Sequence, residues 1–168
     1  MNLMTLSDFA LELGRLTTRV HEESHHALER AAKVVEKEAK ASIGEYQTKA
    51  GQFVAWAPLA DSTVADKERL GYAPPDNPEL RTGTMRESIE HTVKMESFDG
   101  VAYIGSDSKI MEWQELGTSK MPPRSILGGA AVRKADDVAK LVGGSVYGAL
   151  VGGGVYGGRL PIPGLDVE

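Results

Sequence analysis

The pattern His-Glu-x-x-His occurs once in this chain, at 21–25, and has the clearest catalytic spacing. Two imidazoles one helical turn apart can bind a zinc ion, and the glutamate can act as a general base. A third ligand would have to be a nearby glutamate, because His91 belongs to a strand pattern. A solvated face of a charged helix is the favoured interpretation. A metal-dependent hydrolase that uses His21, Glu22 and His25 is the alternative.

The other polar motifs do not assemble a catalytic or cofactor site. The chain has no cysteine, which excludes disulfides, thiolate zinc sites and cysteine nucleophiles. The glycine cluster 152–154 has no lysine after it and opens no helix, so it does not match a phosphate-binding loop. Asp136 and Asp137 read as a charged helix face. We therefore expect a protein that is not an enzyme and needs no metal or cofactor.

Composition places the chain among water-soluble folded proteins of one-domain size, with 168 residues of which 41% are hydrophobic. No apolar run is long enough to cross a membrane, and the first residues lack a signal-peptide pattern. The net charge of −5 disfavours tight binding to nucleic acid, whose phosphates need a clustered basic surface. An acidic protein remains compatible with a channel through which DNA slides.

The first secondary-structure element of the chain is a long helix, predicted over 7–43, which carries the histidine pattern. Apolar residues recur there with heptad spacing, Ser7 is a candidate N-cap, and Gly44 is a natural stop. Two shorter helices, broken near Gly14 or within 21–26, are the alternative. A helix of this length exceeds what a compact domain of this size needs, so we expect it to contact other chains. The heptad residues are Leu6, Phe9, Leu13, Leu16, Val20, Ala27 and Val34.

The middle of the chain, 44–81, is broken by glycines and prolines and is predicted to be a loop. One short helix is expected inside it over 64–70, with Ser62 or Thr63 as its cap. A loop of this length usually has a use, such as reaching a neighbouring subunit.

The segment 82–142 is predicted to hold a small antiparallel sheet and two helices. Residues 88–96 alternate between apolar and polar, and 101–105 can return as the second strand after a turn at Asp99-Gly100. Helical spacing predicts further helices over 108–116 and 125–142. Thr84 and Glu87 match a capping box, which predicts a helical turn before the first strand.

These patterns predict an α+β fold: a long N-terminal helix, a small antiparallel hairpin sheet, and a C-terminal helix packed on it. Residues 1–142 form the expected single domain. The remaining segment, 143–168, is rich in glycine, which makes it costly to order alone. Its apolar and aromatic residues predict a C-terminal arm that orders against a neighbouring copy.

Three segments carry a resemblance to known proteins. Residues 56–67 are similar to the "W-x-P-L-s-x-x-T-x-x-x-K" opening of Mu-like virion-morphogenesis proteins. Residues 80–89 look like the "L-x-x-T-G-x-L-r-x-S-I" element shared with head–tail joining proteins of lambdoid phages. Residues 111–131 are similar to the "Y-a-x-x-x-E-f-G-T-s-x-x-p-x-R-p-f-l-x-p-A" signature of the latter group, from which Trp113 and the segment 125–128 depart. In order and spacing, the chain resembles the tail-completion and head–tail joining family of tailed bacteriophages.

The resemblance implies a structural virion protein of the phage neck. Such a protein forms a homo-oligomeric ring, of six or twelve copies, that joins the DNA-filled head to the tail. Its expected partners are copies of itself, the neighbouring connector or adaptor, and the tail-tube or terminator proteins. Genomic DNA would pass through without tight binding. Assembly would take place in the host bacterial cytoplasm, without a membrane. A tail terminator or minor tail protein of the same particle is an alternative.

The third segment supplies the candidate subunit-contact residues. An aromatic and proline-rich surface buries area at low entropic cost, so a subunit anchor is expected there. Arg124 and Glu115 are expected to pair within or between subunits, and Thr82 and Gly83 to form a structural turn. The full set of contact candidates is Trp113, Glu115, Gly117, Thr118, Met121, Pro122, Pro123 and Arg124.

Overall fold

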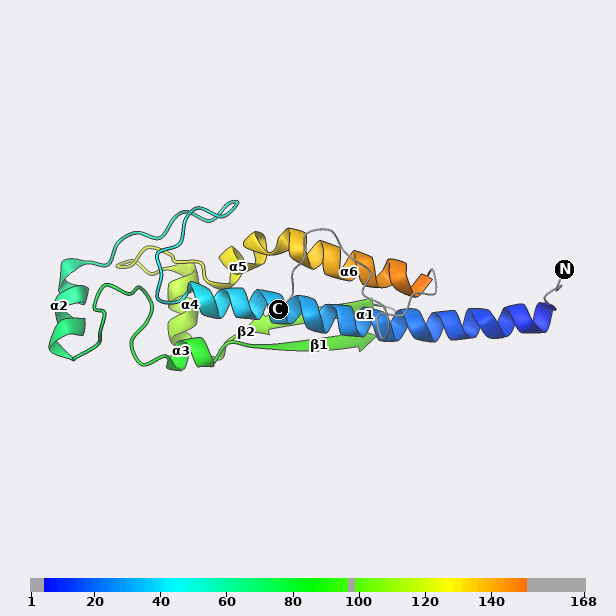
Figure 1. Ribbon diagram of the computed structural model, residues 1–168. Helices are drawn as coiled ribbons and strands as arrows, with labels where there is room; N and C mark the ends of the chain where they lie inside the picture. Colours follow the sequence, from blue (N-terminus) through cyan, green and yellow to red (C-terminus); the bar gives the residue numbers. More distant parts are fainter. Residues whose placement is uncertain (1–4, 97–98, 151–168) are drawn as a thin grey trace. The chain divides into compact units, whose positions relative to one another are not determined.

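The computed structural model describes residues 5–96 and 99–150, which adopt an α+β fold (Figure 1). The two strands form one antiparallel sheet. None of the helices in the described ranges is long and apolar enough to span a membrane. In chain order the elements are α1 (Leu6–Ser42), α2 (Asp61–Arg69), α3 (Thr84–Glu87), β1 (Glu90–Glu96), β2 (Asp99–Gly105), α4 (Lys109–Leu116), α5 (Leu127–Arg133) and α6 (Ala135–Leu150).

Helix α1 confirms the predicted long helix. It runs unbroken for 37 residues, so the alternative of two shorter helices is wrong. The predicted cap at Ser7 is also wrong, because Thr5 caps the helix. The backbone N–H of Asp8 donates to Thr5 Oγ1 over 3.1 Å, and the N–H of Thr5 donates to Asp8 Oδ2 over 3.2 Å. This reciprocal pair satisfies two amides that would otherwise lack partners.

The hairpin also follows the predicted alternation, since β1 exposes every second side chain. The other side chains turn inward, and His91 Nδ1 contacts the Glu36 carboxylate of α1. The predicted turn at Asp99-Gly100 is wrong, because both residues belong to β2. Gly100 is needed for close packing instead. A Cβ there would lie 2.3 Å from Leu28 Cδ1 of α1 and 2.5 Å from the sulfur of Met95.

The predicted helix over 125–142 is in fact two helices, α5 and α6, separated at Lys134. Lys134 leaves the helical conformation, with φ −102° and ψ 6°. Helix α6 then continues past Val142 to Leu150, so the first part of the predicted glycine-rich arm is helical. The remainder, 151–168, lies outside the described residues. Packing explains why glycines are tolerated here, since α6 buries Ser145, Gly148 and Ala149.

The short helices begin at other residues than predicted. Helix α2 starts at Asp61 after Ala60, so neither Ser62 nor Thr63 is its cap. An acidic residue in the first turn favours this start, because it complements the helix dipole. Helix α3 includes Thr84 itself, so the predicted capping box is absent and Gly83 precedes the helix. Helix α4 ends before Gly117, as predicted.

The residue contacts group into two compact units. The first comprises the described residues of 1–31, 93–102 and 136–168. Within it, Arg30 of α1 donates to Ser145 Oγ of α6 over 2.6 Å, beside buried alanines of both helices.

The second unit comprises 32–92 and 103–135. Its core includes Trp56, Ile89, Met111 and Ile126, which come from four separate parts of the chain. Because this core brings the loop 44–81 against α4 and α5, it positions all three segments that carry the family resemblance.

Gly100 provides a test of the hairpin packing. Replacing Gly100 with alanine should reduce the free energy of unfolding by about 1–3 kcal/mol, since the added methyl group must displace Leu28 and Met95. Gly105→Ala in the same strand is the matched control, because a Cβ at Gly105 has no heavy atom within 4 Å. Denaturant unfolding of both variants measures the difference. Equal stabilities would contradict the packing assigned to Gly100.

Candidate functional site

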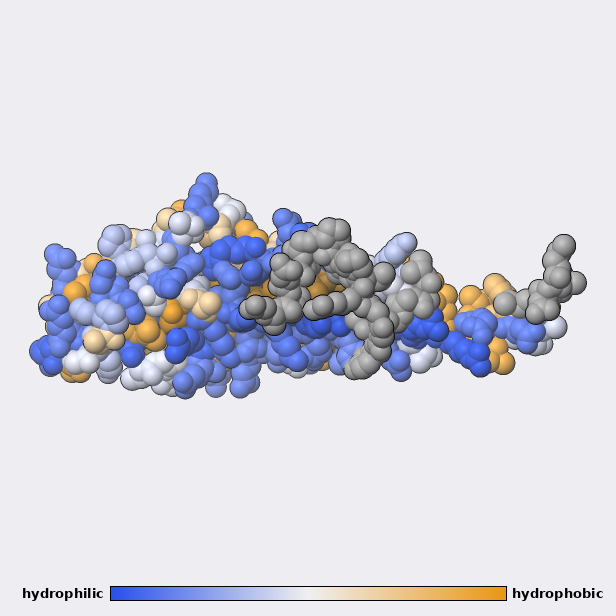
Figure 2. All heavy atoms as spheres, in the orientation of Figure 1, coloured by the Kyte–Doolittle hydropathy of each residue, from blue (hydrophilic) through white to orange (hydrophobic). Residues whose placement is uncertain are grey.

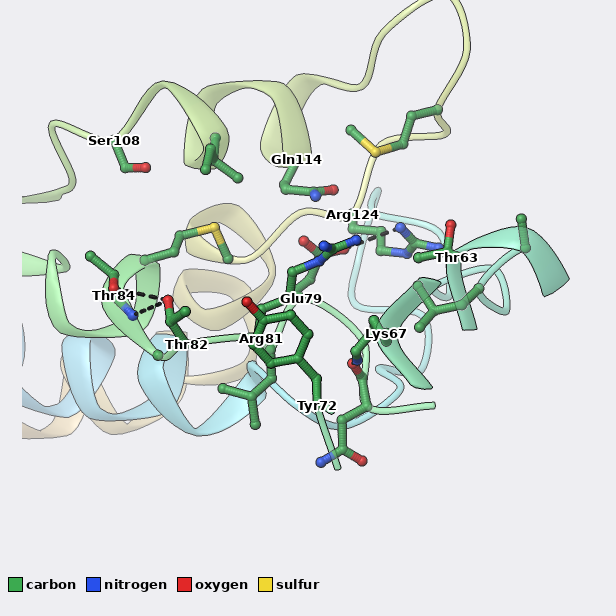
Figure 3. A pocket seen from close by; sticks show the side chains of 18 of the residues that line it. Thr63, Lys67, Tyr72, Glu79, Arg81, Thr82, Thr84, Ser108, Gln114 and Arg124 are labelled. Atoms are coloured by element: carbon green, nitrogen blue, oxygen red, sulfur yellow. Dashed lines mark hydrogen bonds and ion pairs between the residues drawn. The ribbon is translucent and has the colours of Figure 1, made fainter. Parts of the chain in front are cut away.

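A cleft of about 710 Å³ lies in the second unit (Figure 3). Its walls come from α2, from the chain between α2 and α3, from α4, and from the loop that follows α4. Each of the three family-like segments contributes to the lining, through Lys67, Thr82 and Arg124 among others. Segments that lie far apart in the sequence therefore build one site.

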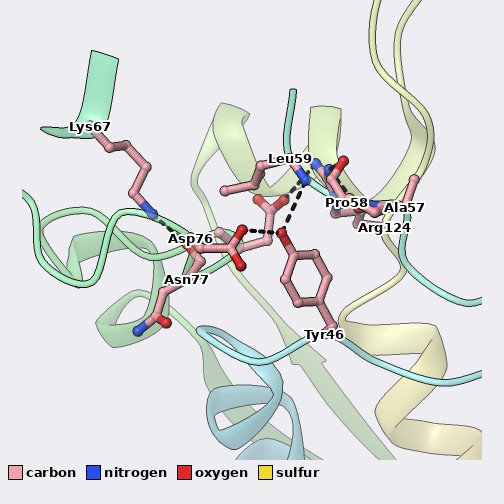
Figure 4. Close-up of polar contacts among 9 residues, drawn as sticks. Tyr46, Ala57, Pro58, Leu59, Lys67, Asp76, Asn77 and Arg124 are labelled. Carbon is pink, nitrogen blue, oxygen red and sulfur yellow. Dashed lines mark hydrogen bonds and ion pairs between the residues drawn. The ribbon is translucent and has the colours of Figure 1, made fainter. Parts of the chain in front are cut away.

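Arg124 connects the first and the third of these segments (Figure 4). Its side chain is only 6% exposed, and Nη1 donates to Glu79 Oε1 over 3.1 Å. Nη2 donates to the carbonyl oxygens of Ala57, at 3.0 Å, and Pro58, at 3.4 Å. The backbone N–H of Arg124 donates to the Gln114 carbonyl oxygen over 2.7 Å. One residue thus fastens the loop after α4 to the segment before α2.

Glu79 is the acidic partner that the sequence did not reveal. Its side chain is 1% exposed, and its backbone has a positive φ of 60°, which is unusual for a residue other than glycine. Burial raises the pKa of Glu79, although the Arg124 guanidinium opposes that shift. No sequence motif includes Glu79, and only the tertiary contact with Arg124 identifies it.

Lys67 is held on the other side of the cleft. The residue is buried, and its Nζ donates to the Asn77 carbonyl oxygen over 2.5 Å. Burial lowers the pKa of Lys67, and the nearby Arg81 lowers it further. The lysine of the family-like pattern therefore fastens α2 to the chain after it, and it does not project as a free surface charge.

A tyrosine outside the family-like segments fixes the entrance to α2. Tyr46 Oη donates to Asp76 Oδ1 over 2.7 Å, and it accepts from the backbone N–H of Leu59 over 3.0 Å (Figure 4). The phenol thereby joins the two sides of the loop 44–81. This loop is consequently ordered by side-chain contacts over much of its length.

Glu115 does not pair with Arg124 as expected. Its carboxylate accepts from Ser125 Oγ at 2.6 Å and from the backbone N–H groups of Ile126, Leu127 and Gly128 at 2.6, 2.9 and 2.9 Å. These amides lie at the N-terminus of α5, where backbone N–H groups have no partners within the helix. The carboxylate therefore acts as a remote cap that joins α4 to α5.

The loop between α4 and Arg124 is a tight turn. Gly117 has a φ of 75°, and a Cβ there would lie 2.9 Å from Pro123 N and 3.0 Å from the Met121 carbonyl oxygen. The N–H of Thr118 donates to that same carbonyl over 2.9 Å. Gly83, at the opposite wall, has a φ of 87° beside the exposed Thr82. Both glycines occupy conformations that strain other residues.

The outward face of α4 is apolar. Ile110, Trp113 and Leu116 follow one another at helical spacing and are all exposed, with Trp113 at 54%. Pro122 and Pro123 are exposed as well. The predicted contact residues therefore divide into two groups: Trp113, Thr118, Pro122 and Pro123 face outward, whereas Glu115, Gly117, Met121 and Arg124 are partly or fully buried and hold the loop in place.

Three buried polar atoms of the cleft residues have no hydrogen-bond partner within the described part of the chain. They are Glu79 Oε2, Gln114 Oε1 and Arg124 Nε, that is, two acceptors and one donor. A buried polar group without a partner is costly. Each of the three atoms is shielded from solvent, so these groups belong to the buried base of the cleft and not to its accessible surface.

The histidine pattern at 21–25 gains no metal site. Within residues 5–96 and 99–150, no three histidine, aspartate or glutamate side chains come together in a group able to hold a metal ion. His25 instead lies edge-on to the ring of His26, with the centroids 5.8 Å apart. His21 and Glu22 lie on the same continuous helix α1.

Comparison with known proteins finds no matching family model, no matching curated protein and no matching solved structure.

Glu115 should be important for stability. Glu115→Ala removes the acceptor of four hydrogen bonds and leaves buried amides unsatisfied, so the free energy of unfolding should fall by about 2–4 kcal/mol. Glu112→Ala on the same helix is the control. That exposed side chain pairs only with Lys109, and its loss should change stability by less than about 0.5 kcal/mol. Chemical denaturation compares the two, and similar losses would contradict the capping role.

Glu79 should make stability depend on pH in a defined direction. Because the pKa of Glu79 is raised in the folded state, folding favours its protonated form. The stability that this side chain contributes is therefore fully present below the pKa of the unfolded chain, and it is lost as pH rises through the folded-state pKa. Wild type should therefore lose stability relative to Glu79→Gln as pH rises from about 4, the ordinary pKa of glutamate in an unfolded chain. Thermal or urea unfolding from this pH upward measures the difference. A constant difference, or one that grows in favour of wild type, would contradict the assignment.

Proposed function

We propose that this protein is a structural component of a tailed-bacteriophage neck. It forms a homo-oligomeric ring at the junction of head and tail, through which genomic DNA passes. The observation that carries the proposal is the meeting of the three family-like segments in one cleft around Arg124. Segments that serve one purpose are expected to meet in space, whereas chance matches scattered over the chain are not.

The second support is the kind of residue that surrounds the cleft. Arg124 and Lys67 of the cleft, and Glu115 next to it, make contacts within the subunit, and the proposal gives them a structural role. Around this polar base lie the apolar face of α4 and two exposed prolines. A rigid polar base with an apolar rim suits the binding of another polypeptide.

In the proposed ring, a segment of the neighbouring subunit occupies the cleft, and the outward face of α4 lies beside it. The cleft of one copy contacts a different surface of the next, and repetition of such a contact by rotation closes a ring. A stable contact would bury about 800 Å² on each copy.

The charge of the chain agrees with DNA passage. A net charge of −5 gives little electrostatic attraction to phosphate, so DNA would slide and not be held. The proposed neighbours are the head connector or adaptor on one side and the tail-tube or terminator protein on the other. The exact position in the neck follows from which of these partners induces the ring.

Trp113 is the variant that tests ring formation. Trp113→Ala should weaken subunit association by about tenfold or more, because exposed aromatic anchors dominate protein contacts. It should leave the unfolding free energy nearly unchanged. Val54→Ala is the control, since Val54 is also exposed and does not line the cleft. Light scattering measures the mass of each protein alone and with purified tail tubes or filled heads.

A ring-sized mass that Trp113→Ala reduces, whether formed alone or only on those particles, is the expected result. A wild-type chain that stays monomeric in the presence of both particles would overturn the neck function. Loss of the ring in Val54→Ala but not in Trp113→Ala would instead move the contact away from α4.

A further inference from the structure

The N-terminal section of α1 carries an apolar stripe that is exposed at its start and partly buried at Leu16 and Val20. Its five residues, the seam residues, are spaced by three and four positions, as in a coiled coil. Three of them are strongly exposed, with Leu6 at 84%, Phe9 at 51% and Leu13 at 47%. Figure 2 shows apolar atoms along this part of the helix. The seam residues are Leu6, Phe9, Leu13, Leu16 and Val20.

The stripe continues into a covered region farther along the helix. Ala27, seven residues after Val20, is fully buried, and Arg30 is bonded to Ser145 of α6. Helix α6 therefore covers the stripe at this end in the same unit. The exposed section is also already helical as part of α1, so a partner would not have to order it.

Charges beside the stripe favour one arrangement of two copies. Glu12 and Arg19 occupy the same flanking heptad position, one heptad apart, and both are exposed. In an antiparallel pair with Leu13 opposite Leu16 of the other copy, Phe9 lies opposite Val20. Glu12 of each copy then faces Arg19 of the other. The two-fold symmetry makes this ion pair twice.

The other arrangements lack this match. An antiparallel pair shifted by one heptad in either direction places Glu12 against Glu12, or Arg19 against Arg19. A parallel pair places both charges opposite neutral residues, Thr17 and Ser24. Only the first register combines apolar layers with opposite charges.

We propose that residues 9–20 of α1 pair antiparallel with the same residues of a second copy, with Leu6 of each copy beside Glu23 of the other at the ends of the contact. The contact is two-fold, so the same surface is used on both copies. It is therefore separate from the head-to-tail contact of a ring, and it joins subunits in pairs. The proposal does not depend on the neck function, because it rests on the exposed seam residues and their flanking charges alone.

Cysteine cross-linking tests the pairing, because the natural chain has no cysteine and an introduced thiol is the sole one. The full-length variants Leu13→Cys and Leu16→Cys are oxidised separately and as a mixture. The antiparallel register places position 13 of one copy opposite position 16 of the other, within disulfide reach. The mixture should thus give disulfide-linked dimers in several-fold excess over either variant alone.

Two results would overturn the proposal. Dimers formed equally well by each variant alone would indicate parallel helices. Absence of dimers in all three samples would mean that another segment, such as 151–168 of the same chain, covers the seam. The mixture is also oxidised with both variants carrying Trp113→Ala. Dimers that persist when this substitution has abolished the ring show that the α1 contact and the ring contact are independent.

Charge reversal provides a second readout. Glu12→Arg and Arg19→Glu should each weaken dimerisation by about three- to tenfold, and the double variant should restore it. Arg15→Glu is the matched control, since it disrupts the 2.6 Å pair between Arg15 and Glu12 within the helix but lies outside the seam. Sedimentation equilibrium measures the dissociation constants. A double variant no tighter than the single ones would refute the Glu12–Arg19 contact.

Discussion

The buried guanidinium of Arg124 is the interaction on which the second unit depends. A charge removed from water must be paired and hydrogen-bonded, and Arg124 satisfies this requirement with Glu79 and with the carbonyl oxygens of Ala57 and Pro58. These partners belong to the irregular segments on either side of α2, so those segments can keep their shape without regular structure. The positive φ of Glu79 is tolerated because the buried ion pair holds that residue in place.

The segment around Arg124 is fixed from both ends. Glu115 holds the start of α5 on one side, and the conformation of Gly117 turns the chain back toward Arg124 on the other. Because these inward contacts occupy the polar side chains of the loop, its apolar residues are left to face outward. The exposure of Trp113 and its neighbours on α4 is therefore a consequence of the inward contacts that the buried polar residues make. A contact surface on a rigid base costs little entropy on binding, which suits a subunit of a ring.

Much of the secondary structure could be predicted because its signals are local. The heptad spacing gave α1, and the alternation of 88–96 gave β1. Two of the errors arose because glycine serves more than one purpose. Gly100 resembled a turn residue but provides space beneath Leu28, and the glycines after Val142 resembled a flexible arm but continue α6 along α1. In both cases tertiary packing outweighed the local preference of glycine.

The sequence by itself determined where most helices and strands form, because periods of 3.6 and 2 residues reflect the geometry of the chain alone. It also predicted that α1 is longer than a compact domain of this size needs. Only the tertiary structure decided how the charges pair. Glu79 and Glu115 are chemically alike, and Arg124 is nearer to Glu115 in the sequence, yet it binds Glu79. Burial and the direction of the backbone make that choice, and neither is visible in a local pattern of residues.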